Sequence, residues 1–132
     1  KTTPGIKHME KKAEYQISSS INQDILEIIL TGEETASNSD QMKSDIDDVI
    51  LKQSIKHVIV DVRALKGRLG VMDTYQRVRS YHPDIHKFNL TLVDLPENEA
   101  YQRYHETTAI NAGLRFKFFT DIDQARAWLR AR

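Results

Sequence analysis

Polar and apolar side chains alternate along the first part of the chain, as they do in strands with one buried face. Tyr15 and Ile17 alternate with polar residues over Tyr15–Ser20, and this period of two predicts a half-exposed strand. The short polar segment Asn22–Asp24 separates this strand from a more continuously apolar run, Ile25–Leu30. Because the turn between the two runs is short, they predict an antiparallel hairpin.

The longest apolar run covers Ile55–Val62 and predicts a strand that is buried on both faces. Such a strand belongs in the interior of a sheet that helices cover on both sides. Two shorter runs predict two further strands, Phe88–Asp94 and Leu114–Phe118, and the second of them has apolar residues at alternate positions.

The segments after the second and third strands have the spacing of amphipathic helices. In the first, apolar residues recur at positions 42, 46, 49 and 50, and Ser37 with Asp40 predicts a capping box at its start. We expect its charged residues to face water, namely Lys43, Asp45, Asp47 and Asp48. In the second segment, Val71, Tyr75 and Val78 mark the inward face, and Pro83 ends the helix.

Two more helices are predicted nearer the C-terminus. The third opens at Pro96–Glu97 and stops at Gly113, with Tyr101, Tyr104, Thr108 and Ala112 along one side. The last is capped by Thr120 with Asp123. Its buried face carries Ile122, Ala125, Trp128 and Leu129.

The element order is therefore β-β-α-β-α-β-α-β-α. Strands that alternate with helices pair in parallel through right-handed crossovers, and the first strand is the natural antiparallel edge. The predicted fold class is α/β, with a mixed, mostly parallel five-stranded sheet that about four helices cover.

Composition narrows the class of protein. The chain has 132 residues, and 19 basic residues balance 19 acidic ones, so no bulk attraction to nucleic acid or an anionic membrane is expected. Without cysteine there is no disulfide, thiolate nucleophile or thiolate metal site. No apolar stretch is long enough to span a bilayer. We expect a cytoplasmic protein, with residues 1–8 an artificial extension before a native start at Met9 and residues 9–132 a single domain.

The loop that leaves the central strand, Ala64–Gly70, is the predicted working site. Loops at the carboxyl ends of parallel strands are where ligands and partners usually dock. Arg63, Lys66 and Arg68, with Gly67 and Gly70, lie close to a predicted helix N-terminus, which favours an anion or an acidic partner. The alternative is an ordinary solvated loop whose glycines only make the turn.

Other polar residues predict little chemistry. His82 and His86 have a metal-ligand spacing, but Pro83 between them predicts an irregular surface connection, so no metal site is expected. We expect His105 on a helix surface, and Glu33 and Glu34 in a solvated loop. Asp61, in a buried strand, needs a partner such as Arg63 or a loop amide. No catalytic residue and no cofactor are predicted.

Two stretches carry a resemblance to a known family: His57–Arg63, and the C-terminal run Asn111–Asp121 continued by Ala125–Leu129. With the element order, they make the chain resemble the STAS domain, the fold of bacterial anti-sigma-factor antagonists, and more closely a SpoIIAA-like family of small bacterial proteins. The resemblance implies a switch serine at the start of the second helix. Here the loop has no hydroxyl residue and Thr74 lies inside the helix, so we expect no phosphorylation switch there.

The function expected from these patterns is that of a non-catalytic, STAS-like binding or regulatory module of bacterial origin. It would present the loop after the third strand to a protein partner or a small anionic ligand. The alternative is a small-molecule or lipid carrier that binds an apolar ligand beside the sheet. An enzyme is disfavoured because the sequence has no nucleophile elbow and no P-loop. The sequence is compatible with a homodimer as well as with a monomer.

Overall fold

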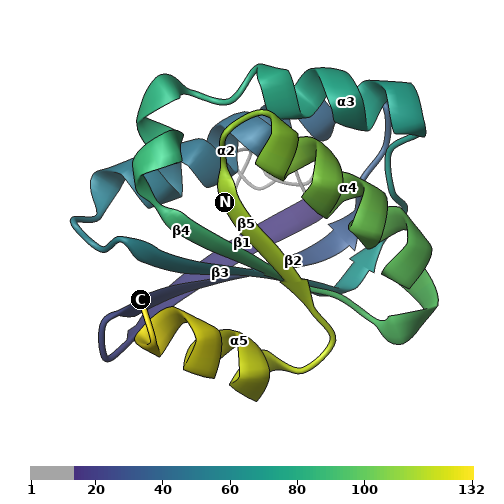
Figure 1. Ribbon diagram of the computed structural model, residues 1–132. Helices are drawn as coiled ribbons and strands as arrows, with labels where there is room; N and C mark the ends of the chain where they lie inside the picture. The colour runs from purple at the N-terminus through teal and green to yellow at the C-terminus, as the bar shows by residue number, and fades with distance from the viewer. Residues whose placement is uncertain (1–13) are drawn as a thin grey trace, which may run out of the picture.

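The structure, a computed structural model, describes residues 14–132 (Figure 1). The predicted extension at residues 1–8 and the predicted start at Met9 lie outside this range. The strands are β1 (Tyr15–Asn22), β2 (Ile25–Glu33), β3 (His57–Lys66), β4 (Asn89–Val93) and β5 (Arg115–Phe119). The helices are α2 (Ser39–Lys52), α3 (Val71–Arg79), α4 (Glu99–Asn111) and α5 (Ile122–Arg130), with short 3-10 turns η1 (Pro83–Lys87) and η2 (Pro96–Asn98).

The five strands form one sheet in the order β1-β2-β3-β4-β5. β1 pairs with β2 in antiparallel orientation, whereas the β2–β3, β3–β4 and β4–β5 pairs are parallel. β3 is therefore the central strand and β1 an antiparallel edge, which confirms the predicted α/β fold class.

Helices cover both faces of the sheet, three on one side and one on the other. α2, α3 and α4 connect successive parallel neighbours and lie over the same face, while α5 lies alone across the opposite face (Figure 1). Right-handed crossovers that advance in one direction along a sheet put their helices on one face, which explains the asymmetry. The larger core lies under the three helices, and a smaller one joins α5 to Ile25, Ile59 and Val93.

The central strand runs further than its apolar run predicts. After a register shift between Ile29 and Thr31, residues 31–33 of β2 pair with Ala64, Leu65 and Lys66. The predicted loop Ala64–Gly70 is therefore reduced to Gly67–Gly70. Gly67 makes the turn with a φ of 79°, and a Cβ at this position would collide with the backbone carbonyl of Glu34. The turn thus requires a glycine.

Two predicted helix caps are wrong. α2 begins after Asn38 and not at a Ser37–Asp40 capping box, because the Asn38 amide instead holds the preceding turn through the Thr35 N–H and the Glu33 carbonyl. α5 is capped by Asp121 rather than Thr120, since the Asp121 carboxylate accepts from the Asp123 N–H at 2.8 Å.

Two predicted helix faces also need correction. Asp47 of α2 is buried, not exposed, and pairs with Lys43 at 2.9 Å. In α3 the inward positions are Thr74 and Val78, whereas Val71 and Tyr75 are exposed. The buried side of α3 also carries Arg77, which pairs with the Glu34 carboxylate from outside the helix. Because α3 has no continuous apolar stripe, hydropathy does not identify its inward face.

Candidate functional site

The five residues of the predicted site do not converge on one point. Arg63, Lys66, Gly67 and Gly70 are exposed, whereas Arg68 is largely buried. The Arg63 guanidinium donates to both carboxylate oxygens of Asp61, at 3.0 and 2.8 Å, so the predicted partner of Asp61 is confirmed. Arg63 also lies within electrostatic reach of Asp121 and Arg126, beside α5 and away from the loop. Of the three predicted cations, Lys66 is the one left exposed beside the turn.

Arg68 folds back under the loop. Its guanidinium donates to the Asp94 carboxylate at the end of β4, with distances of 3.1 Å from Nε and 2.8 Å from Nη2. It also donates to the carbonyl oxygens of Val62, Leu65 and Gly67. Arg68, predicted to contact an anion or an acidic partner, instead links the turn to the sheet.

Asp94 is the acceptor at the centre of this cluster, and it is fully buried. Besides Arg68, its donors are the Leu95 N–H, the Asn98 amide and the Gln102 amide. Burial by itself raises the pKa of the carboxyl, but the hydrogen bonds, that from Arg68 first, outweigh burial and hold the pKa below its usual value. Asp94 is thus an ionised, saturated carboxylate that fixes the start of α4.

A second buried ion pair lies under the helices. Glu34, just past β2, was predicted to be solvated, but its carboxylate accepts from the Arg77 guanidinium of α3 at 2.5 Å. Their side chains are 4 and 14% exposed. Burial opposes the charged form of Arg77, but the nearby Tyr81 and Glu34 side chains more than compensate and raise its pKa.

His105 is buried, contrary to the prediction of a surface residue. Its ring lies 4.8 Å from that of Phe116 and 6.3 Å from that of Tyr101, measured between ring centroids. Burial first, and the charge of Arg77 second, lower the pKa of His105 to about 3, so the ring is neutral near pH 7.

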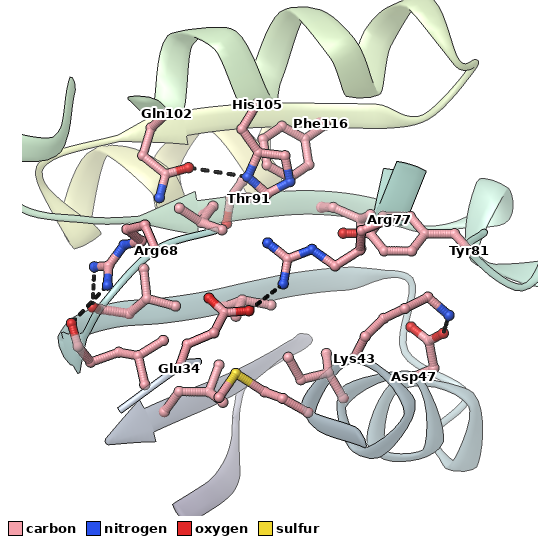
Figure 2. A pocket seen from close by; sticks show the side chains of 18 of the residues that line it. Glu34, Lys43, Asp47, Arg68, Arg77, Tyr81, Thr91, Gln102, His105 and Phe116 are labelled. Carbon is pink, nitrogen blue, oxygen red and sulfur yellow. Dashed lines mark hydrogen bonds and ion pairs between the residues drawn. The ribbon is translucent and has the colours of Figure 1, made fainter. Parts of the chain in front are cut away.

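Glu34, Arg68, Arg77 and His105 line a cavity of about 80 Å³ between the sheet and the helices α2, α3 and α4 (Figure 2). Most of its wall is apolar, including Leu30, Met42 and Val62. The polar lining residues include Glu34 after β2, Arg77 of α3, and Gln102 and His105 of α4. An apolar cavity with a few converging polar groups has the composition of a small-molecule site.

Sequence reasoning missed Glu34, Arg77, Asp94 and Gln102. The burial of Gln102 and His105 could have been predicted, because together with Ala109 they recur at helical spacing on one side of α4. No local signal marks Glu34, since its partner lies 43 positions away along the chain.

A cluster of exposed apolar side chains lies directly after the loop, in the first two turns of α3. Val71, Met72 and Tyr75 are 55, 68 and 41% exposed. On a helix, residues 71 and 75 are neighbours, as are 72 and 75, so the three form one patch, which we call the α3 patch. The Arg79 guanidinium stacks on the Tyr75 ring at 4.4 Å and borders it.

Residues 14–132 offer neither a metal site nor a membrane-spanning helix. Among residues 14–132, no three His, Asp or Glu side chains are placed to hold a metal ion. Within the same residues, no helix combines the length and the apolar character needed to cross a bilayer.

Comparison with known proteins identifies the fold through structure and not through sequence. No protein-family model and no curated protein matches the chain. An anti-sigma factor antagonist from Mycobacterium paratuberculosis is similar in structure, with a TM-score of 0.59 and 14% identity, over 88% of this chain and 94% of that one. An uncharacterised DUF3478 protein with a SpoIIAA-like fold, from Shewanella loihica, has a TM-score of 0.56 and 20% identity, over 87% and 93%. The chain therefore has the SpoIIAA-like fold of STAS domains.

Proposed function

We propose that this protein is a non-catalytic binding module, and that it docks a protein partner on the Gly67–Gly70 turn and the α3 patch. The observation that carries the proposal is the α3 patch itself, because Val71, Met72 and Tyr75 expose apolar surface side by side. Contiguous exposed apolar surface next to polar residues is typical of protein interaction sites. That an anti-sigma factor antagonist has a similar fold supports the proposal.

The turn beside the patch is held in one shape. Arg68 binds three backbone carbonyl oxygens and the Asp94 carboxylate, so the turn is tied to two strands. A surface that is already ordered loses less conformational entropy when a partner binds. Arg68 thus enters the proposed site as the residue that shapes it. Gly67 makes the turn, and Gly70, with open space around it, allows the close approach of a partner.

Charge around the patch sets the chemistry of the proposed partner. Lys66 is exposed next to the turn, and Arg79 is exposed at the other end of the patch. We therefore expect an apolar segment of the partner flanked by acidic residues. Arg63 lies further away, beside α5, and would contribute only at the rim of the interface. Binding of a small anionic ligand at the same turn stays a prediction.

A matched pair of variants tests the proposal. Val71 and Ile21 are almost equally exposed, 55 and 54%, but Ile21 lies at the β1–β2 hairpin, outside the patch. An aspartate at position 71 also suits the first turn of a helix, so Val71→Asp is expected to fold. Wild-type protein and both variants would be used for quantitative affinity capture from a bacterial lysate, with photo-crosslinking from position 72 to identify direct contacts.

The expected result is a protein that crosslinks at position 72, is lost with Val71→Asp and is retained with Ile21→Asp. A partner that is lost equally with both variants, or that crosslinks only through other surfaces, contradicts the proposal.

A further inference from the structure

At the cavity, the helices α2, α3 and α4 leave part of the sheet uncovered. Val60 belongs to the central strand, with a strand on each side, yet it is only half-buried. It lines the cavity, as do the half-buried Lys43 and Ile46 of α2 and the half-buried Tyr81 after α3. The mouth of the cavity therefore lies between α2 and α3.

Two of the lining residues carry a buried polar atom with no hydrogen-bond partner within the described part of the chain. These atoms are Nε of Arg77 and Nε2 of His105. In Figure 2 the His105 side chain points from α4 toward the strands, and the Arg77 side chain extends across the strands toward Glu34. An unsatisfied buried polar atom costs roughly 1–3 kcal/mol, so two of them in one cavity wall call for a partner.

The hydrogen bonds around His105 define what its free nitrogen needs. The Gln102 Nε2 donates to the Asp94 carboxylate at 2.7 Å, so the amide oxygen of Gln102 faces His105 Nδ1 at 3.2 Å. An amide oxygen only accepts, and therefore Nδ1 of His105 carries the proton. The Nε2 of a neutral ring in this tautomer is an acceptor, and it needs a donor. The Nε of Arg77, in contrast, is a donor and needs an acceptor.

The charges that line the cavity are already compensated. Glu34 pairs with Arg77, Lys43 with Asp47, and Arg68 with Asp94. An additional full charge would disturb one of these buried pairs, and buried unpaired charges are costly. The cavity therefore favours an uncharged occupant.

We infer that the cavity binds a small, mostly apolar, uncharged molecule that carries a hydroxyl group, an alcohol or a phenol. The hydroxyl hydrogen is donated to Nε2 of His105, and an oxygen of the same molecule accepts from Nε of Arg77. The apolar part lies against Val60 and Ile46 toward the mouth. Because the cavity of about 80 Å³ is roughly half the size of one that encloses benzene, a ring would extend into the mouth. The two groups that bind the hydroxyl, His105 and Arg77, lie outside the docking surface proposed above, although Arg68 both lines the cavity and holds the turn.

The test compares phenol with toluene, which has the same shape but no hydroxyl. Binding of each probe to the whole protein is measured by NMR titration, and the imidazole nitrogens of His105 are followed by ¹⁵N–¹H correlation. We expect phenol to bind up to about tenfold more tightly than toluene, which corresponds to the net value of one hydrogen bond. The ¹⁵N signal of Nε2 should be that of an unprotonated nitrogen and should move upfield when phenol binds.

Three variants distinguish the contribution of the hydrogen bond to phenol affinity from the contribution of the cavity's shape. His105→Phe keeps an aromatic ring but removes the acceptor, so the preference for phenol should be lost or reversed in favour of toluene, because the buried hydroxyl would lack its partner. His86→Phe, outside the cavity, should leave the preference unchanged, and Ile46→Trp at the mouth should abolish binding of both probes. Equal affinity for phenol and toluene in the wild-type protein overturns the inference. So does the absence of saturable phenol binding, which would mean that the cavity holds ordered water only.

Discussion

The guanidinium of Arg68 and the carboxylate of Asp94 join the turn after β3 to the end of β4 through two parallel hydrogen bonds, 3.1 Å from Nε and 2.8 Å from Nη2. The two residues are 26 positions apart, and Asp94 has no exposed surface. A bidentate pair fixes orientation as well as distance. The shape of the proposed docking surface therefore depends on a contact that lies beneath it.

The first prediction concerns this pair. Arg68→Met should lower the free energy of unfolding by about 3 kcal/mol, because it leaves the Asp94 charge buried without its cation. Urea denaturation monitored by circular dichroism measures the change. Lys66→Met, at an exposed position of the same segment, is the control and should change stability by no more than about 0.5 kcal/mol. Equal effects of the two variants would mean that Arg68 is, after all, a solvated charge.

The pattern of apolar residues predicted the sheet because most of the buried positions in its strands carry apolar side chains. β3 contains the apolar run Val58–Val60, and β5 buries Phe116 and Phe118 at alternate positions. The inward side of α3 was misread for the opposite reason. It holds Thr74 and Arg77, and hydropathy alone assigns such residues to water.

The candidate site could not be predicted in the same way because its contacts are long-range. Glu34 and Arg68 are each buried by a charged partner, and each partner comes from a distant element. A carboxylate or a guanidinium in a sequence carries no sign of whether it will be paired. A loop does follow β3, but the residues predicted to begin it, Ala64–Lys66, belong to the strand, and the roles of its charges required the fold. That ligands or partners dock there stays a prediction.

The turn supplies a second prediction. Gly67 has a φ of 79°, and its missing side chain leaves room for the Glu34 carbonyl. Gly67→Ala should therefore destabilise the protein by about 1–3 kcal/mol, through backbone strain and a displaced strand end. Gly70 has a φ of −68° and open space around its Cα, so Gly70→Ala should be nearly neutral. Thermal unfolding of the two variants tests the contrast, and similar melting temperatures would contradict it.

The third prediction concerns acid. The pKa of His105 falls from 6.5 to about 3 in the folded protein, so between these values the unfolded chain binds a proton that the folded chain does not. Stability therefore falls as the pH drops through this window. From pH 7 to pH 5 the loss due to His105 should be about 2 kcal/mol.

Urea denaturation at pH 7, 6 and 5 measures this slope, because the carboxylates contribute little in that range. His105→Phe should remove most of the slope, whereas His86→Gln, at a residue outside the cavity, should preserve it. A wild-type slope that persists in His105→Phe would show that another group titrates.

The last prediction concerns phosphorylation. Residues 63–70 contain no hydroxyl side chain, so Thr74 is the nearest acceptor for a kinase. Thr74 is fully buried, donates to the Gly70 carbonyl at 3.0 Å, and shares a hydrogen bond of 2.7 Å with the Tyr101 hydroxyl. A kinase must reach the hydroxyl in an exposed, extended segment, and the first turns of α3 would have to unfold to provide one.

We therefore expect no phosphate on Thr74 when the folded protein is incubated with a serine kinase that acts on related switch domains. Intact-mass and peptide mass spectrometry measure this, with a phosphorylated switch domain as the positive control. Thr74→Glu, which forces a charge into the same site, should destabilise the protein by about 2 kcal/mol or more. Stoichiometric phosphate on Thr74 in a protein that stays folded would refute the prediction, because it would require α3 to open without loss of the core.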